Sequence, residues 1–236
     1  MCLFKVPQSK KEILQNVSIV AYSLYLVNEE DEFNEFIDEW MKLNPVYAYN
    51  HNTDEYMVSY NNWCHMGHVT TLAYQYANHI DLKYYDMVVL FFSTMFHDFA
   101  HSFGELNDAT NIKNALHEFE KYITHNRFCN TFVNRVFTNL FLKSAFIRDV
   151  FETIVCTEYP FVHEAKTPIQ MIMRDIDLTM SLSPLELFGE GLTNETKNKF
   201  GKLDRKTMAE FALQQNFYYP EIKEEIEKVL KELNEK

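Results

Sequence analysis

Apolar residues recur at helical spacing along almost the whole chain. The first stripe follows Ser9 and Glu12, which have the S-x-x-E spacing of an N-terminal capping box, and it continues through Ile13, Val17 and Val20. This pattern predicts a helix that begins at Ser9 and buries one face.

A second stripe runs from Phe33 to Trp40 and ends at Asn44-Pro45, because proline disfavours helical backbone in the residue before it. The segments 44–53 and 158–167 resemble regular helix least. The remaining pattern predicts further helices over 54–79, 84–100, 108–125, 129–142, 145–157, 168–180, 184–199, 204–214 and 220–234.

The composition agrees with a helical fold. The chain has only 5 glycines and 6 prolines in 236 residues, too few for the closely spaced turns of sandwiches and propellers. No internal repeat or flexible linker divides it. We therefore expect one compact all-α domain over residues 1–236, in which a core of about 56–180 carries the chemistry and 1–50 and 184–236 supply flanking helices.

The charge excludes some classes of partner. There are 22 Lys+Arg against 34 Asp+Glu, a formal net charge of −12, which opposes binding to nucleic-acid polymers and to anionic membranes. The four cysteines form no C-x-x-C pair, and the longest apolar run, Met87 to Phe92, is far below the ~20 residues of a membrane span. We expect a cytoplasmic protein with a small substrate.

Candidate chemistry begins where an apolar helix meets a polar cluster. His97, Asp98 and His101 follow the apolar stretch that ends at Phe96, and helical spacing would bring the three side chains to one side. Imidazole beside carboxylate suits a divalent cation, either Zn, Mn or Fe, or Mg with more oxygen ligands. The alternative is a hydrogen-bonded His-Asp pair that closes a core helix.

Two distant segments favour the metal. His65 lies within a long aromatic helix upstream, and Asp175 and Asp177 lie within an apolar helix downstream. Ionisable groups buried on separate helices are costly one by one, but they are accounted for together if they surround a cation.

The order of these segments resembles the HD-domain metal-dependent phosphohydrolases, and within them the cyclic nucleotide phosphodiesterases and their small bacterial and phage relatives. The resemblance implies a compact helical bundle with a central metal site. It rests on four motifs between Tyr60 and Leu178: Y-x-N-W-x-H, F-H-D-x-x-H-x-x-G, N-D-x-x-N-I and R-D-x-D-L.

By motif, the resemblance implies one or two divalent ions, with Asp98 as the bridge between them. It implies that His101 hydrogen-bonds a metal-bound water. Asp175 is the alternative to Asp177 as a ligand, although it also has Arg174 beside it as an ion-pair partner. The implied ligands of the first ion are His65, His97, Asp98 and Asp177.

One position departs from the phosphodiesterase pattern. Asn61 stands where those enzymes have the histidine that protonates the leaving 3′ oxygen, and general acid catalysis contributes roughly 100- to 10,000-fold. Either His68 or His101 supplies the proton, or the leaving group, such as a pyrophosphate, needs less help. A third reading is that the acid is absent and the domain only binds nucleotides.

Two further motifs have both a functional and a structural reading. Gln214 and Phe217 have the Q-x-x-F spacing with which phosphodiesterases clamp a nucleobase, but this is also a common polar helix end. Asp108 and Asn111 follow the His-Asp segment and are equally suited to capping the next helix.

The function that the resemblance implies is hydrolysis of a small nucleotide phosphodiester, with a cyclic nucleotide as the leading substrate, by a hydroxide held on metal ions. One alternative is an HD-type nucleotidase or nucleoside triphosphate phosphohydrolase. The other is a catalytically impaired nucleotide-binding module.

Overall fold

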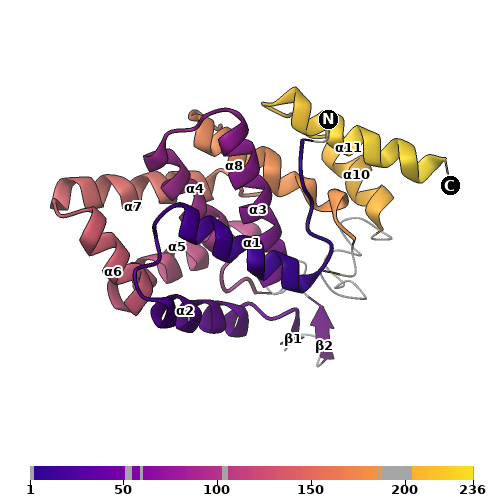
Figure 1. The fold of residues 1–236 in the computed structure, drawn as a ribbon. Coiled ribbons are helices and arrows are strands. Elements are labelled where there is room, and N and C mark those ends of the chain that lie inside the picture. The colour runs from indigo at the N-terminus through magenta and orange to yellow at the C-terminus, as the bar shows by residue number, and fades with distance from the viewer. Residues whose placement is uncertain are drawn as a thin grey trace.

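The predicted all-α class is confirmed by a computed structural model, which describes residues 3–50, 55–58, 61–102, 106–184, 187 and 204–235 (Figure 1). No helix among these residues is both long and apolar enough to cross a membrane. The helices are α1 (Lys10–Ser23), α2 (Glu30–Leu43), α3 (Trp63–His79), α4 (Tyr84–Phe96), α5 (Asp108–His125), α6 (Arg127–Val136), α7 (Leu140–Val155), α8 (Pro168–Asp177), the 3-10 helix η1 (Leu178–Leu182), α10 (Arg205–Leu213) and α11 (Pro220–Asn234).

A short hairpin interrupts the helices, and here the sequence prediction was wrong. Strand β1 (Tyr47–Asn50) pairs antiparallel with β2 (Glu55–Val58), so the helix predicted over 54–79 begins only at Trp63. Asn62 fixes that start, because its side-chain oxygen accepts the backbone N–H of Cys64 at 2.8 Å. The helix predicted over 184–199 lies largely outside the described residues.

The capping residues account for other helix boundaries. Ser9 caps α1 by accepting the N–H of Glu12, but the Glu12 carboxylate accepts the N–H of Gln8, so the predicted capping box is only half formed. The complete box lies instead at the start of α8, where Thr167 and Gln170 bond to each other's backbone N–H groups. Both helices begin where side-chain oxygens replace the missing intrahelical acceptors.

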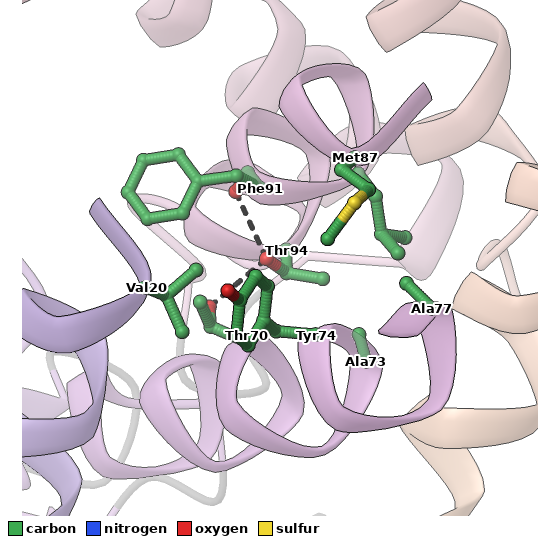
Figure 2. A pocket seen from close by; sticks show the side chains of 9 residues that line it. Val20, Thr70, Ala73, Tyr74, Ala77, Met87, Phe91 and Thr94 are labelled. Atoms are coloured by element: carbon green, nitrogen blue, oxygen red, sulfur yellow. Dashed lines mark hydrogen bonds between the residues drawn. The ribbon is translucent and has the colours of Figure 1, made fainter. Parts of the chain in front are cut away.

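The core is built around α3 and α4, which pack on each other and are surrounded by α1, α7 and α8 (Figure 1). One large hydrophobic cluster joins buried residues from α1 to α11. Figure 2 shows a small pocket between α3 and α4, lined by nine residues without a charged side chain. Thr70 donates there to the hydroxyl of Thr94 at 2.9 Å, so the pocket is part of the packing that fixes α4 against α3.

Gly67 permits the close approach of α3 to α1. A Cβ at this position would lie 2.4 Å from Cγ2 of Ile13 and 3.4 Å from Cγ2 of Val17. We therefore expect Gly67→Ala to lower the free energy of unfolding by about 1–2 kcal/mol, because the overpacking cost of about 1–3 kcal/mol exceeds the gain in helix propensity of up to about 1 kcal/mol.

Urea denaturation measures this change. Ile13→Ala removes the clashing methyl, so Gly67→Ala should cost much less in that background than in the natural chain. Equal costs in the two backgrounds would contradict the proposed clash.

Candidate metal centre

Three helices bring distant polar residues to one place. His65 lies in the first turn of α3, His97 is the C-cap residue directly after α4, and Asp177 is the last residue of α8. Both imidazoles are fully buried, whereas the Asp177 side chain keeps one edge exposed. The site therefore lies at helix ends, within the core but open on one side.

The donor atoms of these residues converge. The Nε2 atoms of His65 and His97 are 3.1 Å apart, and Oδ1 of Asp177 lies 3.1 Å from the first and 3.3 Å from the second. The three donor atoms all fall within 4.8 Å of one another. Oδ2 of Asp98 approaches the same two nitrogens, at 3.1 and 3.4 Å. The two nitrogens and the Asp177 oxygen thus form a group that could hold a metal ion, and the Asp98 oxygen lies against the same two nitrogens.

The partners of the other ring nitrogens determine what this centre fits. Nδ1 of His97 lies 2.9 Å from the carbonyl oxygen of Thr94, and Nδ1 of His65 lies 2.8 Å from the sulfur of Met180. Because Nδ1 must donate to these acceptors, Nε2 of each neutral ring carries a lone pair. Lone pairs and carboxylates at 3 Å repel unless a positive charge lies among them, and an N₂O₂ set is typical of Zn, Mn or Fe.

The pKa values show the same preference for positive charge. Burial alone would lower the pKa of His65, but hydrogen bonds to Asp177 and Asp98 and their negative charges raise it to about 9. Burial would raise the pKa values of Asp98 and Asp177, yet the facing histidines hold both below their usual range. The site favours ionised carboxylates together with a proton or a cation.

Asn44 connects the parts of the site and was not singled out by the sequence. Its side chain donates to the carbonyl of Trp40 at 2.7 Å and accepts the N–H of Ala100 at 2.8 Å, while its own carbonyl accepts the N–H of Trp63 at 2.9 Å. It therefore joins the end of α2 to the start of α3 and to the turn after α4. The only sequence signal was its place before Pro45, which was interpreted as a helix stop.

The segment after α4 is a turn, whereas the sequence predicted helix to residue 100. The helix ends at Phe96, and Ala100 has a left-handed φ of 55°. His97 and His101 consequently do not meet as i,i+4 neighbours on one helix. The turn instead keeps the charge of His101 close enough to Asp98 to contribute to the low pKa of that carboxyl.

The start of α5 holds His101, and its capping differs from the expectation. Asn107 is the capping residue of α5, so neither Asp108 nor Asn111 has that role. The buried Asn111 amide donates to Nε2 of His101 at 2.9 Å, which leaves the ring proton of neutral His101 on Nδ1. Asp108 accepts the N–H of Tyr159 and so anchors the segment after α7.

Asp175 has a different role from Asp177. Its carboxylate accepts the backbone N–H groups of Tyr218 and Tyr219, at 2.9 and 2.8 Å, just before α11. Asp175 is therefore engaged in holding α11, and the suggested ion pair with Arg174 does not form among the described contacts. Burial raises the pKa of Asp175 to about 7 despite these two hydrogen bonds.

Among known proteins, no family model matches the chain, and no curated protein does. The fold is similar to that of a phosphodiesterase domain. That domain belongs to the RhoPDE fusion protein of the choanoflagellate Salpingoeca rosetta, and its crystal structure aligns with 100% of this chain and 94% of its own, with a TM-score of 0.58 and 14% identity. At this identity the likeness establishes the fold alone.

His68, one of the two candidate acids, has different surroundings from His101, which Asn111 holds at the start of α5. His68 is fully buried, and its ring nitrogens face the hydroxyls of Thr179 at 3.2 Å and Ser183 at 2.9 Å. Burial lowers the pKa of His68 to about 3, so the ring is neutral at pH 7 and carries no imidazolium proton to donate. This placement favours a structural role. Asn61 is half-buried directly before the cap of α3.

Gln214 and Phe217 lie away from the described contacts of the metal centre. Gln214 is exposed at the end of α10, and Phe217 is half-buried against the main hydrophobic cluster. Their role in base binding stays a prediction. Cys64, next to His65, is buried, and burial raises its thiol pKa to about 12, which is unsuited to a nucleophile.

Proposed function

We propose that this protein is an HD-type, metal-dependent phosphohydrolase that cleaves a small nucleotide phosphodiester, with a cyclic nucleotide as its substrate. The observation that carries the proposal is the convergence of His65, His97 and Asp177 on one centre, with Asp98 against the same two imidazoles. The likeness of the fold to a phosphodiesterase domain supports the same reaction class.

The four residues would hold one divalent cation, and Asp98 would be the bridge to a second. When bound, such cations lower the pKa of water and neutralise phosphoryl oxygens. Thr94 and Met180 fix the ring orientations of His97 and His65, and Asn111 fixes the tautomer of His101. The protein thus supplies rigid ligands, so little reorganisation accompanies binding.

A second candidate function is release of a better leaving group from a nucleotide, as in a nucleotidase or a triphosphate phosphohydrolase. Asn61 favours it, because an amide cannot donate the proton that an alkoxide leaving group requires. The neutral, buried state of His68 favours it further. A pyrophosphate-type leaving group departs without that proton.

A hydrolysis screen tests the proposal. The purified protein, supplied in turn with Zn, Mn, Fe and Mg, is incubated with cyclic mononucleotides, cyclic dinucleotides and deoxynucleoside triphosphates, and the products are identified by phosphorus NMR. Linear monophosphate formed from a cyclic nucleotide, and lost on chelation, is the expected result. Turnover of triphosphates alone would support the second candidate function. Metal binding without turnover of any substrate would favour the nucleotide-binding module instead.

A further inference from the structure

A corner of the molecule remote in sequence from the metal ligands exposes an unusual number of apolar side chains. Leu140, Phe141 and Leu142 are consecutive and are 83, 77 and 51% exposed. They form the first turn of α7 where it follows α6, at the edge of the molecule away from α10 and α11 (Figure 1). We call residues 136–143 the α6–α7 corner.

The corner is a built feature of the fold. Asn139 caps α7 by accepting the N–H of Phe141 at 2.8 Å. Beneath the exposed turn, the rings of Phe137 and Phe146 stack with centroids 4.7 Å apart and anchor the corner to the core. Leu140 to Leu142 are therefore held outward by buried neighbours.

Tyrosines surround the corner. Arg135 donates to the carbonyls of Tyr25 and Leu26, at 2.9 and 3.1 Å, which places the turn after α1 beside α6. The ring of Tyr85 lies 6.3 Å from that of Phe137. Seven of the twelve large apolar side chains exposed among the described residues belong to this region: Tyr25, Tyr84, Tyr85, Val136, Leu140, Phe141 and Leu142.

The segment that forms the corner has a charge opposite to that of the whole chain, although Asp149, which accepts the hydroxyl of Tyr85 at 2.8 Å, lies beside it. The 28 residues from Lys121 to Arg148 contain five lysines and arginines and no aspartate or glutamate, although the chain carries a net charge of −12. Arg127 and Arg148 pair with Glu32 and Asp149. Arg135 and Lys143, which flank the exposed turn, donate instead to neutral oxygens and keep their charge uncompensated by those contacts.

We propose that the α6–α7 corner docks the protein on an anionic phospholipid bilayer. Leu140, Phe141 and Leu142 would enter the boundary between headgroups and acyl chains, the tyrosines would lie at headgroup level, and Arg135 and Lys143 would face the lipid phosphates. The expected exclusion of membranes followed from the net charge, which does not describe this local cluster.

The shape of the corner favours a bilayer over a protein partner. Three consecutive residues of a helix point about 100° apart, so they form a convex knob and not a flat face. A stable protein interface needs roughly 800 Å² of complementary surface on each side, far more than three side chains supply. A bilayer accepts a convex apolar knob without a matching cavity.

Vesicle co-sedimentation of the full chain tests the proposal. We expect binding to phosphatidylserine-containing vesicles, at least ~10-fold weaker binding to pure phosphatidylcholine vesicles, and weakening by salt. The triple variant Leu140→Ser, Phe141→Ser, Leu142→Ser should lose ~10-fold or more in affinity, as should Lys143→Glu. The matched control is Ile19→Ser with Val162→Ser, which removes exposed apolar side chains elsewhere and should bind like the natural chain.

Several outcomes would overturn the proposal. Equal affinity for neutral and anionic vesicles would show that charge does not contribute to binding. A loss of affinity in the control variant equal to that in the triple variant would show nonspecific adhesion. Absence of vesicle binding, combined with self-association that the triple variant abolishes in analytical ultracentrifugation, would assign the corner to a second copy of the chain. Circular dichroism of each variant checks that the helical fold is retained.

Discussion

Asp177→Asn should weaken binding of the divalent cation by at least ~100-fold and abolish the proposed phosphohydrolase activity. Replacing a residue that only hydrogen-bonds a metal ligand already lowers metal affinity by about 10- to 100-fold. Loss of a direct ligand should lower it further. Asp177 contributes an oxygen that lies 3.1 and 3.3 Å from the two histidine nitrogens. An amide keeps the size of the side chain but removes half of the site's carboxylate charge.

Asp175→Asn is the matched control on the same helix. Asp175 is more deeply buried than Asp177, but it accepts the N–H groups that precede α11. We expect this variant to lose about 1–3 kcal/mol of folding stability, because an amide oxygen replaces a carboxylate as acceptor, while its metal content stays near that of the natural chain.

Metal content by mass spectrometry and affinity by titration calorimetry separate the two variants. Full metal occupancy in Asp177→Asn, or metal loss in Asp175→Asn with Asp177 intact, would reverse the assignment of the ligand. Asp98→Asn should behave like Asp177→Asn, since Asp98 approaches the same two imidazoles. In each case circular dichroism should show a largely unchanged helix content.

Asn61→His should raise the rate of cyclic phosphodiester hydrolysis by about 100- to 10,000-fold if the proposed substrate is right. An imidazolium at this position supplies the proton that the leaving alkoxide needs, which an amide cannot supply. Because the gain requires the protonated ring, it should decline as the pH rises above the pKa of the new histidine. The readout is kcat and kcat/KM as a function of pH.

Asn61→Gln is the control, since it alters the side chain without adding a titratable group and should give no gain. Hydrolysis of a triphosphate by Asn61→His should stay within a fewfold of the natural chain, because that leaving group needs no added acid. No gain on any cyclic substrate, together with damage by His68→Ala, would place the acid at His68 and contradict the neutral, structural role that its burial indicates.

The residues that converge on the metal centre could be predicted because they are ionisable residues within otherwise apolar segments. His65, His97 and Asp177 interrupt apolar helices, and an ionisable group in such a place requires a partner. The sequence alone did not decide whether Asp175 or Asp177 is the metal ligand. In the structure, Asp175 accepts backbone N–H groups from a segment more than 40 residues further along the chain.

The residues that position the site could not be predicted. Asn44 and Met180 act through contacts with distant elements, and nothing in their local sequence distinguishes them from a helix stop and a core residue. The strand Glu55–Val58 was interpreted as helix because so short a segment does not distinguish the apolar period of a helix from that of a strand. The turn after Phe96 was missed because alanine rarely adopts the left-handed conformation that Ala100 has. This conformation is held by the hydrogen bond from the Ala100 N–H to the distant Asn44 side chain.

The polarity of the helices that meet at the cluster adds a field of its own. α4 reaches it with its C-terminal end, at His97, whereas α3 reaches it with its N-terminal end, near Asn61. The aligned peptide dipoles place about half a negative charge at the end of α4 and about half a positive charge at the start of α3. The backbone therefore attracts a cation from one side and a phosphate group from the other, and this contribution persists when any single side chain is replaced.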